Sequence, residues 1–200
     1  MNDSTNVSCL ILPGGTPLYH EGEDENTGWD AGARAIVSTD FDERHRHMRK
    51  EIYGFDKPSN GQGGHVRFEN GRYEYLLMPG ETVNIGLGLV IAVEQGYTAV
   101  LSRRGGTGVK DLDLLSEPDI PEYITDRMGN VFIDPGFRGE PIARLHNGGK
   151  VSFPIWKGRR LVQFGFWKVM VSPKIGYVSA LDELGHTHRG ARCHNSSGTG

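Results

Sequence analysis

The sequence predicts an all-β fold, a barrel or jelly roll built from many short strands. The 200 residues include 29 glycines and 10 prolines, and such a density of turn-forming residues favours short strands over long helices. Short apolar runs recur along the chain at regular spacing, which is typical of antiparallel barrels and jelly rolls. The length suits one domain with a sizeable core. We expect that domain to span residues 1–185, with short helical insertions.

The charge and the cysteines narrow the functional class. A net charge of −3 argues against a dedicated nucleic-acid-binding protein, which would usually be basic. Cys9 and Cys193 are far apart and form no CxxC motif, so neither a zinc site nor a disulfide framework is indicated. No signal-like segment opens the chain, and no run approaches the roughly 18 apolar residues of a membrane span. We expect a cytoplasmic protein with neither nucleic acid nor membrane as its partner.

The first third of the chain predicts strands joined by a charged segment. Residues 9–12 form an apolar run that ends at a Pro-Gly-Gly sequence, and residues 27–38 return to a β-like pattern. The densely charged stretch 40–52 predicts one surface helix. Its two histidines, His45 and His47, do not share a helical face, which favours a solvated surface over a metal site.

The rest of the chain predicts further strands and a tail. Residues 65–75 predict a hairpin that turns at Asn70 and Gly71. The acidic stretch 111–126 predicts a loop insertion with one helical turn, and residues 186–200 predict a flexible tail because they show no apolar periodicity. Strands are expected at residues 82–93 (one long strand or a pair), 97–101, 131–133, 141–145, 151–156 and 161–171.

Residues 129–147 are the segment on which the functional interpretation of this sequence is centred. The apolar strand at residues 131–133 breaks at Asp134, Pro135 and Gly136, which force a tight turn, and Phe137 follows at once. The chain then resumes as a second strand. This pattern predicts a hairpin whose tip presents a carboxylate and an aromatic ring together.

Arginines lie beside glycines in three places. Glycine lets backbone N–H groups approach an anion, and guanidinium supplies planar, permanently charged donors, so these pieces suit a polyphosphate. Each cluster alone is more typical of a solvated turn. The clusters are Arg103-Arg104-Gly105-Gly106, Gly158-Arg159-Arg160 and Arg189-Gly190-Ala191-Arg192, and the hydroxyls of Ser196 and Ser197 follow the last one.

Taken together in this order, the motifs resemble those of the trimeric dUTPase family and its sister family, the dCTP deaminases. The resemblance runs from about Leu12 to the C-terminus, with residues 40–72 and 111–126 as insertions. The third and fourth motifs are the specific ones, and the third has the Ile-Asp-Pro-Gly form of the deaminases. The five motifs are DAGARA at 30–35, SRRGG at 102–106, GNVFIDPGFRGE at 129–140, GRRLVQFGF at 158–166 and RGARCHNSSG at 189–198.

The resemblance implies a distorted jelly-roll subunit, a homotrimer, and three active sites at the subunit interfaces. It also implies Mg²⁺ held mainly by the substrate's phosphates rather than by protein ligands. Asp134 becomes the catalytic carboxylate that orients and deprotonates the attacking water, and the ring of Phe137 stacks on the deoxyribose. The implied phosphate contacts are Arg103, Gly105 and Gln163. The residues of a tail that closes over the nucleotide are Arg189, His194, Ser196 and Ser197.

Two arginines depart from the family pattern. Arg34 occupies the position of the first-motif aspartate, and Arg104 that of the second-motif serine. Both would add positive charge near the triphosphate. They would either take over part of the metal's electrostatic role or give a tight binder that turns over poorly. Asp30, four residues before Arg34, is a candidate substitute for the missing aspartate.

Three functional hypotheses follow. The first is a pyrophosphohydrolase that converts a pyrimidine deoxynucleoside triphosphate, by default dUTP, to monophosphate and pyrophosphate. The second is a nucleotide-binding regulatory protein with weakened turnover, and the third is a purely structural module on the same fold. Deamination of dCTP is disfavoured because Arg144 stands where the deaminases have a glutamate, and an arginine cannot perform that proton transfer.

Overall fold

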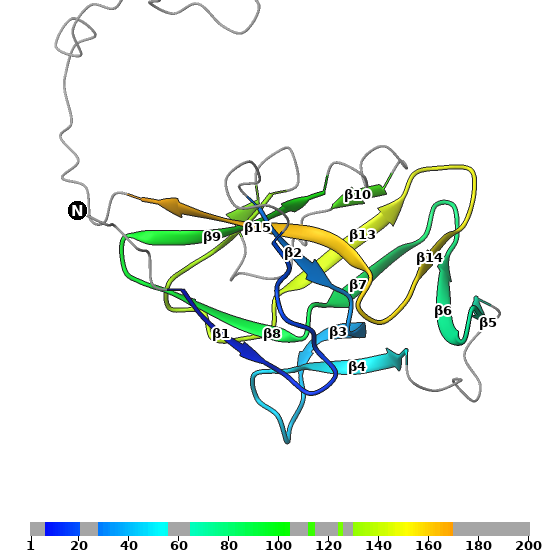
Figure 1. Cartoon of the computed structure of the whole chain (residues 1–200), viewed down its shortest axis with the longest axis horizontal. Helices are drawn as coiled ribbons and strands as arrows, with labels where there is room; N and C mark the ends of the chain where they lie inside the picture. Colours follow the sequence, from blue (N-terminus) through cyan, green and yellow to red (C-terminus); the bar gives the residue numbers. More distant parts are fainter. Residues whose placement is uncertain are drawn as a thin grey trace, which may run out of the picture. The chain divides into compact units, whose positions relative to one another are not determined.

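The computed structural model describes residues 7–20, 28–55, 65–104, 112–114, 124–125 and 130–169, and every regular element in them is a β-strand (Figure 1). The strands are β1 (Val7–Ile11), β2 (Trp29–Gly32), β3 (Ala35–Phe41), β4 (Arg49–Gly54), β5 (Val66–Glu69), β6 (Arg72–Leu77), β7 (Thr82–Gly86), β8 (Leu89–Val93), β9 (Tyr97–Arg103), β10 (Leu112–Leu114), β11 (Ile124–Thr125), β12 (Val131–Ile133), β13 (Ile142–Asn147), β14 (Phe153–Ile155) and β15 (Arg160–Lys168).

Two five-stranded sheets carry the functional motifs. One has the order β10-β13-β7-β3-β4 and the other the order β11-β12-β9-β15-β2. Shorter ladders join β1 to β8, and β14 to β6 and β5. All pairings are antiparallel, and neighbours in a sheet are often distant in sequence. This is the topology of a jelly roll, so the all-β prediction is confirmed.

One apolar core unites strands of both large sheets. Alternate side chains of the strands enter it, as in β13, where Ala143 and Leu145 are buried while Arg144 is only partly covered. The fully buried large side chains are Leu77, Ile85, Leu87, Leu89, Ile91, Leu101, Ile133, Leu145, Ile155, Leu161 and Phe164.

The hairpin predicted at residues 65–75 is confirmed. Strands β5 and β6 pair from Val66 opposite Tyr75 to Glu69 opposite Arg72. The two connecting residues, Asn70 and Gly71, have φ angles of 52° and 76°. A two-residue turn with both φ angles positive matches the right-handed twist of the flanking strands.

The surface helix predicted at residues 40–52 is wrong. Strand β3 continues to Phe41, residues 42–48 form a loop, and β4 begins at Arg49. The Asp42 carboxylate accepts the N–H groups of Arg44 and His45, both at 2.9 Å, and these local bonds hold the start of the loop. Of the predicted insertion 111–126, the described residues 112–114 and 124–125 are strands and not a helical turn.

The hairpin predicted at residues 131–145 is also wrong, although its turn is present. Strand β12 pairs with β9 and β11, whereas β13 pairs with β7 and β10. The connection therefore passes from one large sheet to the other instead of folding back. Strand β12 already has a partner on each side, so β13 cannot pair with it.

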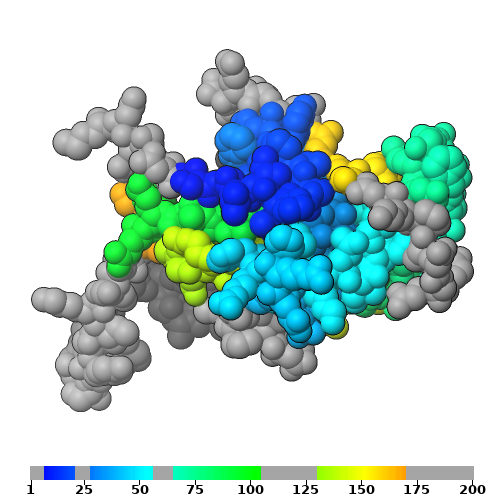
Figure 2. All heavy atoms as spheres, turned by 90° about the horizontal axis from the view of Figure 1, so that it is seen from below, coloured from blue at the N-terminus to red at the C-terminus, as the bar shows by residue number. Residues whose placement is uncertain are grey.

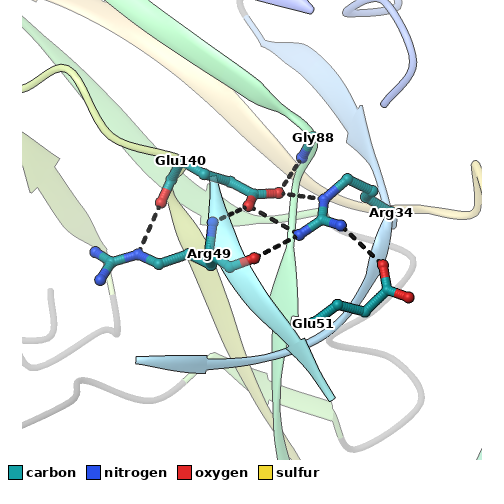
Figure 3. Close-up of polar contacts among 5 residues, drawn as sticks. All are labelled: Arg34, Arg49, Glu51, Gly88 and Glu140. Atoms are coloured by element: carbon teal, nitrogen blue, oxygen red, sulfur yellow. Dashed lines mark hydrogen bonds and ion pairs between the residues drawn. The ribbon is translucent and has the colours of Figure 1, made fainter. Parts of the chain in front are cut away.

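A buried ion-pair network lies at the end of this crossing and is centred on Glu140, two residues before β13 (Figure 3). Glu140 is fully buried, and its carboxylate accepts Arg34 Nε at 2.7 Å and Arg34 Nη2 at 3.0 Å. The same carboxylate accepts the backbone N–H groups of Arg49 at 2.8 Å and Gly88 at 2.7 Å. Arg34 also donates to Glu51 at 3.1 Å. The network therefore links four segments of the fold. They are the residue just before β3, the start of β4, the turn between β7 and β8, and the end of the crossing.

Removal of the Glu140 carboxylate should therefore destabilise the fold strongly. In Glu140→Ala, the buried Arg34 loses its bidentate partner, and we expect the free energy of unfolding to fall by about 3–5 kcal/mol. The measurement is urea denaturation followed by tryptophan fluorescence. The double variant Glu140→Leu with Arg34→Met should lose less, because it leaves no unpaired buried charge.

The matched control is Glu43→Ala, which removes an exposed carboxylate from the loop at residues 42–48. It should change the free energy of unfolding by no more than about 0.5 kcal/mol. Equal effects of Glu43→Ala and Glu140→Ala would contradict a structural function for the network.

Candidate active site

The first part of the site is the turn that follows β12. The N–H group of Phe137 donates to the carbonyl oxygen of Asp134 at 3.0 Å, which closes a four-residue turn. The Asp134 side chain is exposed and Phe137 is half-buried against the core. A guanidinium nitrogen of Arg138 donates to the carbonyl oxygen of Phe137 at 2.8 Å and also to that of Pro135. The turn is thus held by its own backbone and by one side chain.

Close packing below the turn sets the position of its aromatic ring. Gly139 is buried, and a Cβ atom added there would lie 2.6 Å from the ring of Phe41 and 2.8 Å from that of Phe137. Only glycine lets both rings approach the backbone at this point. The guanidinium of Arg49 covers Phe41, with 3.8 Å between its Cζ and the ring centroid, so that ring has little room to retreat.

A pocket of about 470 Å³ opens over this turn. It combines a carboxylate with two aromatic rings and two guanidinium groups, a mixture suited to a ligand with both a flat apolar part and a charged part. The structure thus brings together Asp134 and Phe137, as the motif predicts. The residues that line the pocket are Phe41, Arg46, Asp134, Gly136, Phe137, Arg138 and Gly139.

The second part of the site lies where β9, β15 and β2 run side by side. Gln163 of β15 is opposite Ser102 of β9 on one side and Asp30 of β2 on the other. The register therefore places segments of the first, second and fourth motifs next to one another. Arg103 ends β9 opposite Val162, one position beyond the pair of Ser102 and Gln163.

Asp30 is the centre of this cationic group. Its carboxylate lies 2.7 Å from Arg104 Nε and 3.5 Å from Arg160 Nη1, and Asp30 itself is only 9% exposed. Arg160 also stacks over the ring of Tyr19, 4.3 Å from its centroid. One carboxylate between two guanidinium groups reduces their mutual repulsion and holds both near the surface. The net positive charge that remains suits an anionic ligand.

Arg34 does not belong to either part. It is 4% exposed, and its Nε, Nη1 and Nη2 atoms donate to Glu140, Glu51 and the carbonyl oxygen of Arg49. The structure therefore gives no support to the prediction that Arg34 contacts a substrate, because its guanidinium is committed to the interior. The partner that buries it, Glu140, is 106 residues away in sequence, and the first motif alone contains no sign of it.

The remaining predicted residues lie elsewhere. Arg144 is in β13 opposite Asn84, in the other large sheet from Gln163. Gly105 and the tail residues Arg189, His194, Ser196 and Ser197 lie outside the described residues. Sequence reasoning missed Arg46, whose only signal was its place in a charged stretch that we interpreted as a solvated helix.

The two parts of the site are far apart within one chain. Asp134 follows Ile133, which is opposite Ala99 near the start of β9, whereas Arg103 is the last residue of that strand. Thr98, the neighbour of Ala99 on the side of Asp134, is five residue steps from Arg103 along β9, which is about 17 Å at roughly 3.3 Å per residue. Asp134 and Arg103 therefore lie at opposite ends of the β9 ladder rather than side by side within one chain.

Among the described residues, no three histidine, cysteine, aspartate or glutamate side chains gather in a way that could hold a metal ion. The same part of the chain has no helix with the length and hydrophobicity needed to cross a membrane.

Individual proteins, but no family model, match the sequence of this chain. The chain is similar to the deoxyuridine 5′-triphosphate nucleotidohydrolase of Brucella melitensis, with 31% identity over 127 residues that cover 63% of this chain and 71% of the relative. The enzyme of the same name from Fowlpox virus is 29% identical over 126 residues, 63% of this chain and 77% of that protein.

Solved structures show the same fold. The dUTPase of Staphylococcus bacteriophage 80alpha, determined with dUpNHpp, superposes with a TM-score of 0.62. The alignment covers 98% of this chain and 99% of that one at 15% identity.

The packing below the turn can be tested with two neighbouring glycines. Gly139→Ala should lower the free energy of unfolding by about 1–3 kcal/mol, because the added methyl group collides with two packed rings. Gly136→Ala is the matched control, since a Cβ atom there meets nothing within 4 Å and the backbone is not left-handed. Thermal denaturation of both variants measures the difference, and equal melting temperatures would contradict the role given to Gly139.

Proposed function

The chain belongs to the deoxyuridine 5′-triphosphate nucleotidohydrolase (dUTPase) family, and we propose that it hydrolyses dUTP to dUMP and pyrophosphate. The observation that carries this proposal is the exposed Asp134 carboxylate, held by a tight turn in a pocket that it shares with the ring of Phe137. A carboxylate near the reacting phosphate and an aromatic face for the nucleoside are two groups that this reaction needs.

In this proposal Asp134 is the general base. Its carboxylate orients a water molecule and accepts a proton as the water oxygen attacks phosphorus. The bond between the α-phosphorus and the bridging oxygen breaks, and pyrophosphate leaves with the electron pair. Asp134 is exposed, so its carboxylate is accessible to both water and substrate. Phe137 presents a flat apolar surface on which the deoxyribose can stack.

The cationic group around Asp30 is the proposed triphosphate site. Arg103, Arg104 and Gln163 would contact phosphate oxygens, and the fixed guanidinium groups would stabilise charge that develops on the leaving pyrophosphate. The register that aligns Gln163 with Ser102 and Asp30 supports this grouping. The sequence motifs are the only support for the remaining residues of the proposed site, which are Gly105, Arg189, His194, Ser196 and Ser197. In this proposal residues 186–200 form a tail that closes over the nucleotide.

Magnesium would enter with the substrate. Mg²⁺ prefers several oxygen ligands and commonly takes them from substrate phosphates plus one or two carboxylates. Asp134 is the one acidic side chain among the residues that line its pocket, which fits an ion held mainly by the triphosphate. When bound, the ion would neutralise part of the phosphate charge.

We also propose that the active protein is a homotrimer with sites shared between subunits. The separation of about 17 Å between the two parts, from strand geometry, is bridged if Asp134 of one subunit meets the arginines of its neighbour. Ile11 and Trp29 are 48% and 41% exposed and line one apolar pocket with Leu18 and Phe166. Exposed apolar surface of this kind is typical of a face that another chain covers.

The role of Asp134 predicts the effect of its amide. Asp134→Asn keeps the size of the side chain but cannot accept the proton, so we expect kcat for dUTP to fall by about 10²–10⁴. Affinity for dUpNHpp, which resists hydrolysis, should change little. Chromatography of the products measures the reaction, with dCTP, dTTP and UTP as competing substrates and Asp40→Asn, an exposed aspartate outside the pocket, as the control. Unchanged turnover in Asp134→Asn would rule out this mechanism.

Shared sites predict complementation between two inactive variants. Asp134→Asn and Arg103→Ala should each be nearly inactive alone. After denaturation and joint refolding at equal concentrations, about a quarter of the sites should combine two intact halves if subunits mix at random. Activity near that fraction of wild type is therefore expected, and light scattering should give the mass of a trimer. No recovery in a mixture that scattering shows to be trimeric would mean that each site lies within one subunit.

A further inference from the structure

The loop at residues 42–48 has a fixed shape. The N–H group of Asp42 donates to the carbonyl oxygen of Met48 at 2.8 Å, and that of Met48 donates to His45 at 2.7 Å. The Asp42 carboxylate accepts two further N–H groups, from Arg44 and His45. These bonds lower the pKa of the Asp42 carboxyl, because they favour its charged form. The loop is therefore closed at both ends and braced in the middle.

The same loop is hydrogen-bonded to the segment that directly follows the turn at residues 134–137. The backbone N–H group of Glu140 donates to the carbonyl oxygen of His47 at 2.7 Å. The ring Nδ1 of His47 lies 2.5 Å from the carbonyl oxygen of Arg138, and because a carbonyl only accepts, the ring donates. Figure 2 shows the yellow-green segment that contains the turn at the surface beside the blue-to-cyan segment that contains the loop. The loop and the turn thus form two walls of one pocket.

Arg46 is the residue through which this loop enters the pocket. It lines the cavity together with Asp134 and Phe137, whereas its neighbours Arg44 and His45 do not. The side chain is exposed, and it makes no hydrogen bond or ion pair with any other described residue. The other guanidinium of the pocket, that of Arg138, donates to two carbonyl oxygens of the turn. Arg46 is therefore the cation of the pocket that can engage a ligand.

We propose that Arg46 binds a phosphate oxygen of the nucleotide that lies against Asp134 and Phe137. The inference rests on the proposed function, since Asp134 can activate water only where a phosphate is close to it. A guanidinium matches phosphate oxygens in charge and geometry. It also offsets the repulsion between the Asp134 carboxylate and an anionic substrate. Arg46 thereby supplies, from the same subunit as the general base, a positive charge that Arg103 and Arg104 cannot supply from about 17 Å away along β9.

Competitive inhibition separates a phosphate contact from other effects. Inhibition constants of dUMP and of deoxyuridine against dUTP hydrolysis would be measured for the wild type, Arg46→Ala and Arg46→Lys. The control is Arg44→Ala, an exposed arginine of the same loop that does not line the pocket. In Arg46→Ala the inhibition constant of dUMP should rise about tenfold or more, the usual effect of one lost charged hydrogen bond. That of deoxyuridine should stay within about twofold. Arg46→Lys should recover part of the loss, and Arg44→Ala should match the wild type.

Each other outcome is decisive. Equal dUMP inhibition in Arg46→Ala and the wild type overturns the inference alone. Parallel loss of dUMP and deoxyuridine also overturns it, because the contact would then be to the nucleoside or to the fold. A wild-type protein that does not hydrolyse dUTP overturns the proposed function, and the role of Arg46 with it.

Discussion

The buried ion pair between Arg34 and Glu140 is the interaction on which the geometry of this chain depends. Glu140 collects four donors on its carboxylate, from Arg34, Arg49 and Gly88, and these donors come from separate parts of the fold. Such an arrangement is satisfied only when every part is in place, because any missing donor leaves a buried charge without compensation. Glu140 also ends the segment that begins at Asp134. The network therefore fixes where the crossing between the two sheets ends, three residues after the turn formed by Asp134 to Phe137.

Local features of the fold could be predicted from the sequence, whereas long-range pairing could not. Short apolar runs gave most strands, and the two turns at Asn70 and at Asp134 follow from the backbone preferences of Asn, Gly and Pro. The helix expected at residues 40–52 failed because charge density says little about secondary structure, and both ends of the segment belong to the paired strands β3 and β4. The hairpin expected after Val131 failed because consecutive strands often pair with each other but need not do so. Here β12 pairs with β9 and β13 pairs with β7, and both partners are distant in sequence.

The same distinction explains the outcome for the site. Asp134 and Phe137 are three residues apart, so their shared pocket could be expected from one motif. Arg34 and Arg104 looked equivalent in the sequence, as two added charges near a phosphate. The structure separates them, because Arg34 pairs with Glu140 in the interior while Arg104 pairs with Asp30 near the surface. Half of the reason to suspect a regulatory protein with weak turnover therefore disappears, since Arg34 no longer adds charge where the triphosphate would bind.

The loop at residues 42–48 connects this structural network to the proposed chemistry. Its two ends are continuous with β3 and β4, and His47 contacts both Arg138 and Glu140, which follow the turn that carries Asp134. Arg49, directly after the loop, stacks on Phe41 and donates to Glu140. The loop, the turn and the buried pair are consequently connected by hydrogen bonds within one chain. Because Asp134 and Arg46 both belong to these connected segments, a change in the ion pair should disturb the proposed base and its neighbouring cation together, while the arginines around Asp30 keep their own support from β2, β9 and β15.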